Sequence, residues 1–119
     1  MPQAICGRDR RGATAARGVF VVVIVFRMRM QPGAQKELVA STRAMYALAA
    51  AQPGFVAYKH FMAEDGELLA HIEFASEEAA AAFRAHPEHR AVQERGRDGL
   101  LAEYRMQICT LVRESRFPR

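Results

Sequence analysis

The side chains of this sequence that are best suited to move a proton near neutral pH are a few histidines and tyrosines. Tyr58 and His60 alternate in an apolar run, and His89 lies one helical turn before Gln93. Tyr46 precedes a Gln-Pro-Gly break in the chain. In an apolar pocket, such groups could take a proton from a weakly acidic ligand and hold the anion. We expect His89 first as the base.

Each of these side chains also has a purely structural interpretation. Tyr46 lies on the apolar stripe of a predicted helix, where a packed ring with a bonded hydroxyl is common. The strand pattern leaves open whether His60 faces the core, the solvent or a partner subunit. His71 alternates with the polar face of its strand, which is typical of an interface residue. His86 directly precedes Pro87, so it could simply bond to the local backbone.

A metal or nucleotide site is not indicated by these residues. His86-x-x-His89 could supply two ligands, but Pro87 disturbs the helical spacing, and no cysteine or carboxylate completes a convincing set. The sequence GRDG at 96–99 is not the G-x-G-x-x-G of dinucleotide sites, and it precedes a strand. We therefore expect no metal and no cofactor.

The elements that must position these side chains begin with a strongly apolar segment. Residues 19–30, VFVVVIVFRMRM, predict a strand that is buried on both faces for most of its length. Residues 34–52 change to helical periodicity. Residues 55–63 and 68–74 predict two strands, joined by a hairpin turn at Asp65-Gly66.

The second half of the chain repeats the pattern of helix and strand. Ser76 is a predicted N-cap for a helix over 77–85, and Pro87 restarts a helix that runs to about residue 95 and stops at Gly96. Residues 100–113 predict a long final strand. The order βαββαβ predicts an α+β, ferredoxin-like fold with a four-stranded antiparallel sheet.

One face of that sheet predicts a homodimer. The two helices cover one face, and the first strand presents four valines, at positions 19, 21, 23 and 25, to the other. Leaving a valine in water forgoes about 1.5–3 kcal/mol. A second copy that packs sheet against sheet would bury them, and the N-terminal tail is the alternative cover.

Length and charge limit the remaining classes of function. A chain of 119 residues has room for one domain, predicted at 19–116. Of the net charge of +4, residues 1–18 carry +3, so the remainder is almost neutral and indicates no nucleic-acid partner. The apolar run at 19–26 is too short to cross a membrane.

Residues 1–18 predict a disordered basic extension, or an over-called start site. The cysteines, Cys6 and Cys109, lie far apart and form no C-x-x-C motif, so neither a disulfide framework nor a zinc motif is indicated. Cys109 is interpreted as a small apolar strand residue, and the protein as reduced and cytoplasmic.

Several stretches resemble one known family in their order and spacing. These are Met45-Tyr46 before QPGF at 52–55, FASEE at 74–78, FRAHPEH at 83–89 and QERGR at 93–97. Over about residues 19–116, the chain resembles the antibiotic biosynthesis monooxygenase family, of the dimeric α/β-barrel superfamily. The resemblance implies a dimeric barrel with a pocket between the sheet and the helices of each subunit.

The resemblance also implies a choice of chemistry. Some members of the family oxygenate aromatic polyketides without metal or flavin, and others bind and degrade haem. The haem-degrading members use an Asn, a Trp and a His at positions that hold Phe26, Phe83 and Gln93 here, which argues against haem degradation. The preferred hypothesis is a cofactor-independent monooxygenase of a small electron-rich aromatic, such as a quinol or anthrone. A haem-binding or haem-degrading protein and a non-catalytic ligand-binding dimer are the alternatives.

For that hypothesis, the candidate residues divide into two groups. The catalytic candidates are His89, Tyr46 and His60, and the candidates for binding the substrate are Phe26, Tyr58, Phe74, Phe83 and Gln93.

Overall fold

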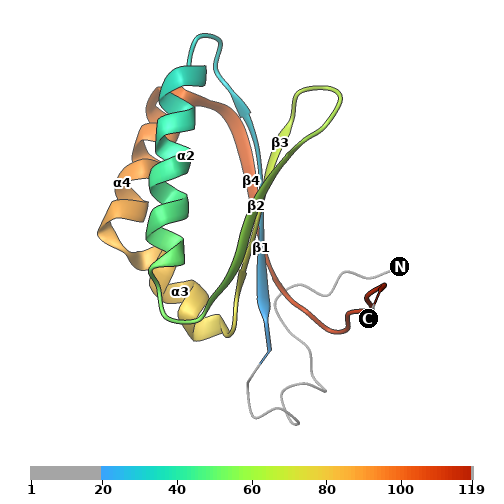
Figure 1. Cartoon of the computed structure of the whole chain (residues 1–119). Helices are drawn as coiled ribbons and strands as arrows, with labels where there is room; N and C mark the ends of the chain where they lie inside the picture. The colour runs from blue at the N-terminus through green and yellow to red at the C-terminus, as the bar shows by residue number, and fades with distance from the viewer. Residues whose placement is uncertain (1–19, 119) are drawn as a thin grey trace.

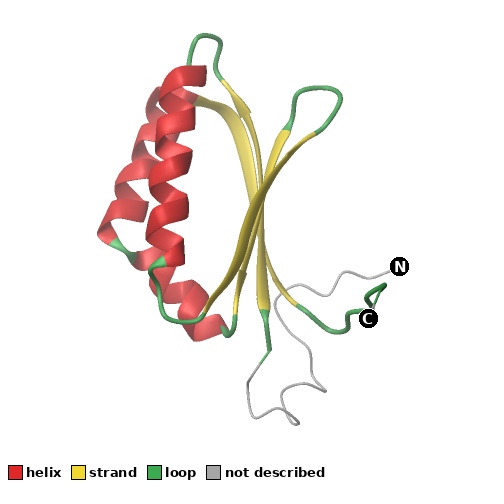
Figure 2. Ribbon diagram, in the orientation of Figure 1, coloured by secondary structure: helices red, strands yellow, loops and turns green. Residues whose placement is uncertain are grey.

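A computed structural model of the protein describes residues 20–118. Its elements are β1 (Val22–Met30), α2 (Gln35–Ala50), β2 (Phe55–Met62), β3 (Leu68–Phe74), α3 (Glu77–Ala85), α4 (Pro87–Arg95), the π-helical turn η1 (Gly96–Leu100) and β4 (Leu101–Thr110). The strands form one antiparallel sheet in the order β2-β3-β1-β4. All the helices lie on one face of this sheet (Figures 1 and 2). The predicted α+β, ferredoxin-like fold is therefore confirmed, whereas the prediction for residues 1–18 lies outside the described residues.

The central strand β1 separates the two faces of the sheet as its alternation predicts. Val22, Ile24 and Met28 are buried toward the helices. Val23 and Val25 point to the opposite face, and both are half-buried. The strand is apolar on both sides because it lies in the interior of the sheet, between β3 and β4. One side of β1 therefore forms the core, and the other remains available for a further contact.

Fewer residues of helix α2 are buried against the sheet than its sequence pattern predicts. Its buried residues are Ser41, Met45 and Ala49. Tyr46 is 50% exposed, so its predicted place on the core stripe is wrong. One residue along a helix is a rotation of about 100°, and Met45 takes the inward position instead. Tyr46 packs at the edge, with its ring 6.3 Å from that of Phe55.

The break between α3 and α4 follows from local chemistry. The Ser76 side chain accepts a hydrogen bond from the backbone N–H of Ala79 at 3.1 Å and begins α3. His86 is extended, with ψ of 136°, as expected for a residue before proline. Its Nδ1 accepts a hydrogen bond from the N–H of Glu88 at 3.1 Å, which begins α4. His86 is thus a helix cap, in agreement with the local role considered for it.

Helix α4 ends at Arg95 with Gly96 as its C-cap, as predicted. Gly96 itself has right-handed dihedral angles (φ −60°, ψ −47°), and the chain continues into the turn η1. A Cβ at this position would lie 3.2 Å from Cδ1 of Leu101, so the glycine allows close packing on β4. Because of this turn, the last strand begins at Leu101 rather than at residue 100. It ends at Thr110 rather than at residue 113.

None of the helices in residues 20–118 has the length and apolar character needed to span a bilayer.

Cys109 lies on β4 beside Val23, and it is not a free thiol, so the interpretation of it as reduced is wrong. The cytoplasmic location inferred partly from that interpretation stays a prediction.

Candidate active site

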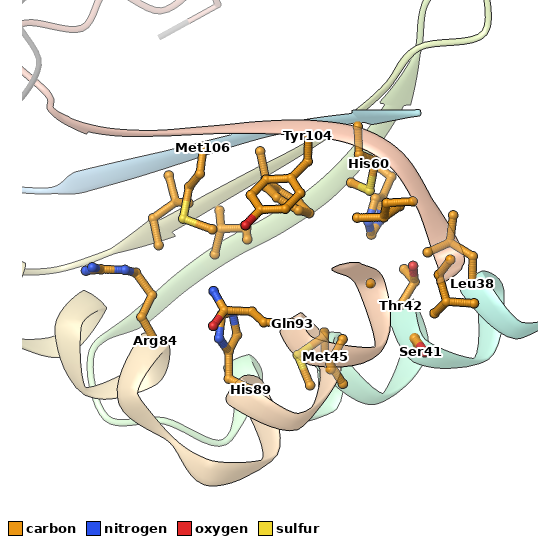
Figure 3. A pocket seen from close by; sticks show the side chains of 18 of the residues that line it. Leu38, Ser41, Thr42, Met45, His60, Arg84, His89, Gln93, Tyr104 and Met106 are labelled. Atoms are coloured by element: carbon orange, nitrogen blue, oxygen red, sulfur yellow. The ribbon is translucent and has the colours of Figure 1, made fainter. Parts of the chain in front are cut away.

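A cavity of about 90 Å³ lies between the helices and the sheet. Its walls are largely apolar and come from all four strands, the three α-helices and η1, with Ile24, Met28, Met45, Val92 and Met106 among them. Figure 3 shows the labelled side chains of this lining, which converge on one space from both the helices and the sheet. An enclosed apolar space with a few polar groups is the usual form of a small-molecule site.

Most of the candidates from the sequence meet in this cavity. Its lining includes Phe26, Tyr58, His60, Phe83, His89 and Gln93. Two candidates are not part of the lining. Phe74 is fully buried behind Phe83, with a ring distance of 5.3 Å, and it supports the wall from the core. Tyr46 lies outside, with its ring against Tyr58 at 5.6 Å.

His89 is the most unusual side chain of the cavity. It is only 9% exposed, and its ring packs edge-on against Phe83 at a centroid distance of 4.6 Å. Its Nδ1 is buried and has no hydrogen-bond partner in the described part of the chain. Burial lowers the pKa of His89, and the positive charge of Arg84 lowers it further. The imidazole is therefore neutral at pH 7.

Strand register settles which face His60 occupies. His60 pairs with Ala70 and Tyr58 with Ile72, both of which are buried toward the helices. Partial burial lowers the pKa of His60, and burial raises the pKa of Tyr58 to about 12. The Tyr58 hydroxyl is thus a neutral hydrogen-bond donor at physiological pH, and His60 is a second neutral imidazole at the more open end.

The polar side chains of the lining that were not among the sequence candidates are Ser41, Thr42, Arg84 and Tyr104. Tyr104 lies on β4 opposite Met28, with its ring 5.4 Å from that of Phe26. Its hydroxyl oxygen accepts a hydrogen bond from Nη1 of Arg97 at 3.3 Å. Strand parity could have found Tyr104, because it shares a face with Met106. Arg84 has no comparable signal, since an arginine in the last turn of a helix is usually solvated.

The described residues show no ready ligand set for a metal. In residues 20–118, no three His, Cys, Asp or Glu side chains gather closely enough to hold an ion. The positions compared with the haem-degrading pattern, Phe26, Phe83 and Gln93, all line the cavity. The polar groups of the lining are thus imidazole, phenol, aliphatic hydroxyl, amide and guanidinium side chains.

Comparison with known proteins identifies relatives of this fold. The family model described as "Antibiotic biosynthesis monooxygenase" matches residues 21–95. No curated protein matches the chain.

Solved structures extend the comparison to the whole fold. Rv0793 from Mycobacterium tuberculosis superposes with a TM-score of 0.72 at 22% identity, over 81% of this chain and 99% of that one. SnoaB, a cofactor-independent oxygenase from Streptomyces nogalater, gives 0.70 at 20% identity, over 84% and 99%. A putative antibiotic biosynthesis monooxygenase from Nitrosomonas europaea gives 0.69 at 12% identity, over 84% and 94%. At these identities, the structures show a shared fold.

Proposed function

Because the chain belongs to the antibiotic biosynthesis monooxygenase family, we propose that it is a cofactor-independent monooxygenase of a small electron-rich aromatic compound. The observation that carries this proposal is His89, a buried neutral imidazole in the lining of an apolar cavity. A base in such surroundings can ionise a bound phenol or anthrone. SnoaB, which shares the fold, is a cofactor-independent oxygenase, and this supports the same class of reaction here.

The reaction can be balanced without any added electron carrier. His89 takes a proton from the bound substrate, and the resulting anion transfers an electron to O₂. The substrate radical and superoxide then combine to form a peroxide at the ring carbon. In an anthrone, the CH₂ group becomes a carbonyl as the O–O bond of the peroxide breaks, and the second oxygen atom leaves as water with the proton that His89 carries and the remaining hydrogen of that carbon as a proton. Oxygen is reduced entirely by the substrate, so the protein needs only to bind, deprotonate and shield it.

The first test is oxygen uptake by the purified protein. After treatment with a chelator, the protein is mixed with hydroquinones, anthrones and polyphenols in an oxygen electrode. We expect uptake above the buffer rate, with a quinone as product, and no increase on addition of flavin or haem. Uptake that depends on haem, together with a visible band on haem titration, would contradict the proposal in favour of a haem protein. Saturable ligand binding without any uptake would favour a non-catalytic binding dimer.

The pH dependence of the reaction follows from the state of His89. The base must be neutral to accept a proton, so kcat/KM rises as pH increases through the pKa of His89. Burial and Arg84 lower that pKa below the usual 6.5, and the midpoint of the acid limb is therefore expected below pH 6.5. His60→Gln, which removes the other imidazole with a lowered pKa, should keep this limb. A midpoint above pH 6.5, or its loss in His60→Gln, would contradict the role of His89.

A homodimer is also part of the proposal. The face of the sheet opposite the helices carries the half-buried Val23 and Val25 of β1. Ion pairs lie toward one end of this face, where Arg27 donates to both carboxylate oxygens of Glu67 at 2.9 and 3.0 Å. An apolar centre beside paired charges suits a second copy of the same face.

A further inference from the structure

The cavity contains a permanent positive charge without a matching negative one. Arg84 is the only arginine or lysine of its lining, and no aspartate or glutamate of the described residues is part of that lining. Arg84 comes from α3, and Figure 3 shows it at the Met106 end of the lining, with its guanidinium at the outer edge of the group. The side chain is half-buried, and no ion pair or hydrogen bond of its guanidinium is found in residues 20–118.

The other polar groups of the lining also favour a negatively charged ligand. Arg97 donates to the hydroxyl oxygen of Tyr104, which leaves the Tyr104 proton available for a second hydrogen bond. Tyr58 is a neutral phenol for the reason given above. These groups can donate to an anion, and the cavity offers no carboxylate that would repel one. An apolar wall with donors and a guanidinium is the environment that recognises a carboxylate on an aromatic ring.

We propose that the ligand of this cavity is an aromatic acid whose carboxylate is held by Arg84. This inference rests on the proposed function only for the statement that the acid is also oxygenated. A cavity needs about 10–15 Å³ to hold one water, so the 90 Å³ of this cavity suits a compact ring system of one or two rings. The carboxylate supplies orientation, and the ring presents its reactive carbon toward His89.

The simplest alternative is that Arg84 stabilises α3 alone. It lies in the last turn of that helix, where a cation interacts favourably with the helix dipole. That role requires no ligand, and it predicts a change in stability on removal of the charge without a change in ligand preference. The two roles are therefore separated by measuring binding and unfolding on the same variants.

The test uses a matched pair of probes that O₂ does not consume. Binding of 2-naphthoate and of its neutral analogue 2-naphthamide is measured by titration calorimetry under anaerobic conditions. We expect the wild-type protein to prefer naphthoate by about tenfold or more, as for a charge-assisted hydrogen bond. Arg84→Gln should lose this preference while naphthamide binding is unchanged, and Arg84→Lys should retain part of it. Arg90→Gln, on the exposed side of α4, should behave as the wild type.

Each other result overturns the proposal. Equal affinity of the wild type for both probes, no saturable binding of either, or a full preference for naphthoate in Arg84→Gln would all contradict it. A loss of stability in Arg84→Gln with the preference intact would assign Arg84 to α3. Because no oxygen is present, this result is independent of the oxygenase test: a preference for naphthoate without any oxygen uptake would retain the aromatic acid and reject the oxygenase.

Discussion

His89→Phe is expected to lower kcat/KM for oxygen uptake by about 10²–10⁴-fold, the usual contribution of a positioned general base. The free energy of unfolding should change little in the same variant. Nδ1 of His89 is buried without a partner in the described residues, and a phenyl ring keeps the contact with Phe83. Replacing an unsatisfied buried polar group by an apolar one of similar shape is nearly neutral or stabilising.

The matched control for this experiment is the neighbouring imidazole. His86 caps α4 through its Nδ1 and is not part of the cavity lining. His86→Asn keeps a capping oxygen and should leave kcat/KM within about twofold of the wild type. Activity is read from oxygen uptake, and stability from urea unfolding. If His89→Phe kept the full rate, His89 would not be the base, and if it were strongly destabilised, His89 would be a structural residue.

The fold could be predicted from the sequence because its signals are local. The alternation in β1 assigns Val22 and Ile24 to one face and Val23 to the other whatever surrounds the strand. Asp65-Gly66 fixes a hairpin because Gly66 has φ of 91°, a conformation that glycine adopts readily. Pro87 fixes the break between α3 and α4, since it restrains the residue before it. Gly96 ends α4 as predicted, but its packing against Leu101 is a tertiary contact that no local signal reveals.

A site residue could be predicted only where the periodicity of its own helix or strand shows which way its side chain points. His89, Gln93 and Phe83 reach the cavity from the inner side of their helices. The face of His60 needed the register with Ala70, which no pattern within β2 contains. Tyr46 was placed inward because one step of helical rotation separates it from Met45.

The cavity and the proposed dimer face are two sides of the same strand. On β1, Phe26 and Met28 line the cavity, while Val23 and Val25 point to the opposite face. The side chains on either face of a strand are set by the same backbone, so a partner that packs on the valines also restrains the wall of the site. A substitution at the open face is therefore expected to change dimer formation directly, and to change the cavity only through the loss of the partner.

Val25→Glu is expected to weaken the proposed dimer by about a thousandfold or more in Kd. Val25 lies at the centre of the open face, between His71 on β3 and Gln107 on β4. In a sheet-to-sheet dimer, the variant would bury a carboxylate from each subunit away from water, at a cost of several kcal/mol, and about 1.4 kcal/mol corresponds to tenfold in Kd. In the monomer the same side chain can reach solvent, so the fold should persist.

Molar mass measured by light scattering over a range of concentrations decides between these states. The wild type should elute as a dimer, Val25→Glu as a folded monomer, and the control Val39→Glu, at a 45% exposed position on α2, as a dimer. A monomeric wild type would contradict the dimer and would favour the N-terminal tail as the cover of the valines. A dimer of undiminished affinity in Val25→Glu would place the interface elsewhere, because two buried carboxylates cannot be accommodated on an apolar face without a large loss of affinity.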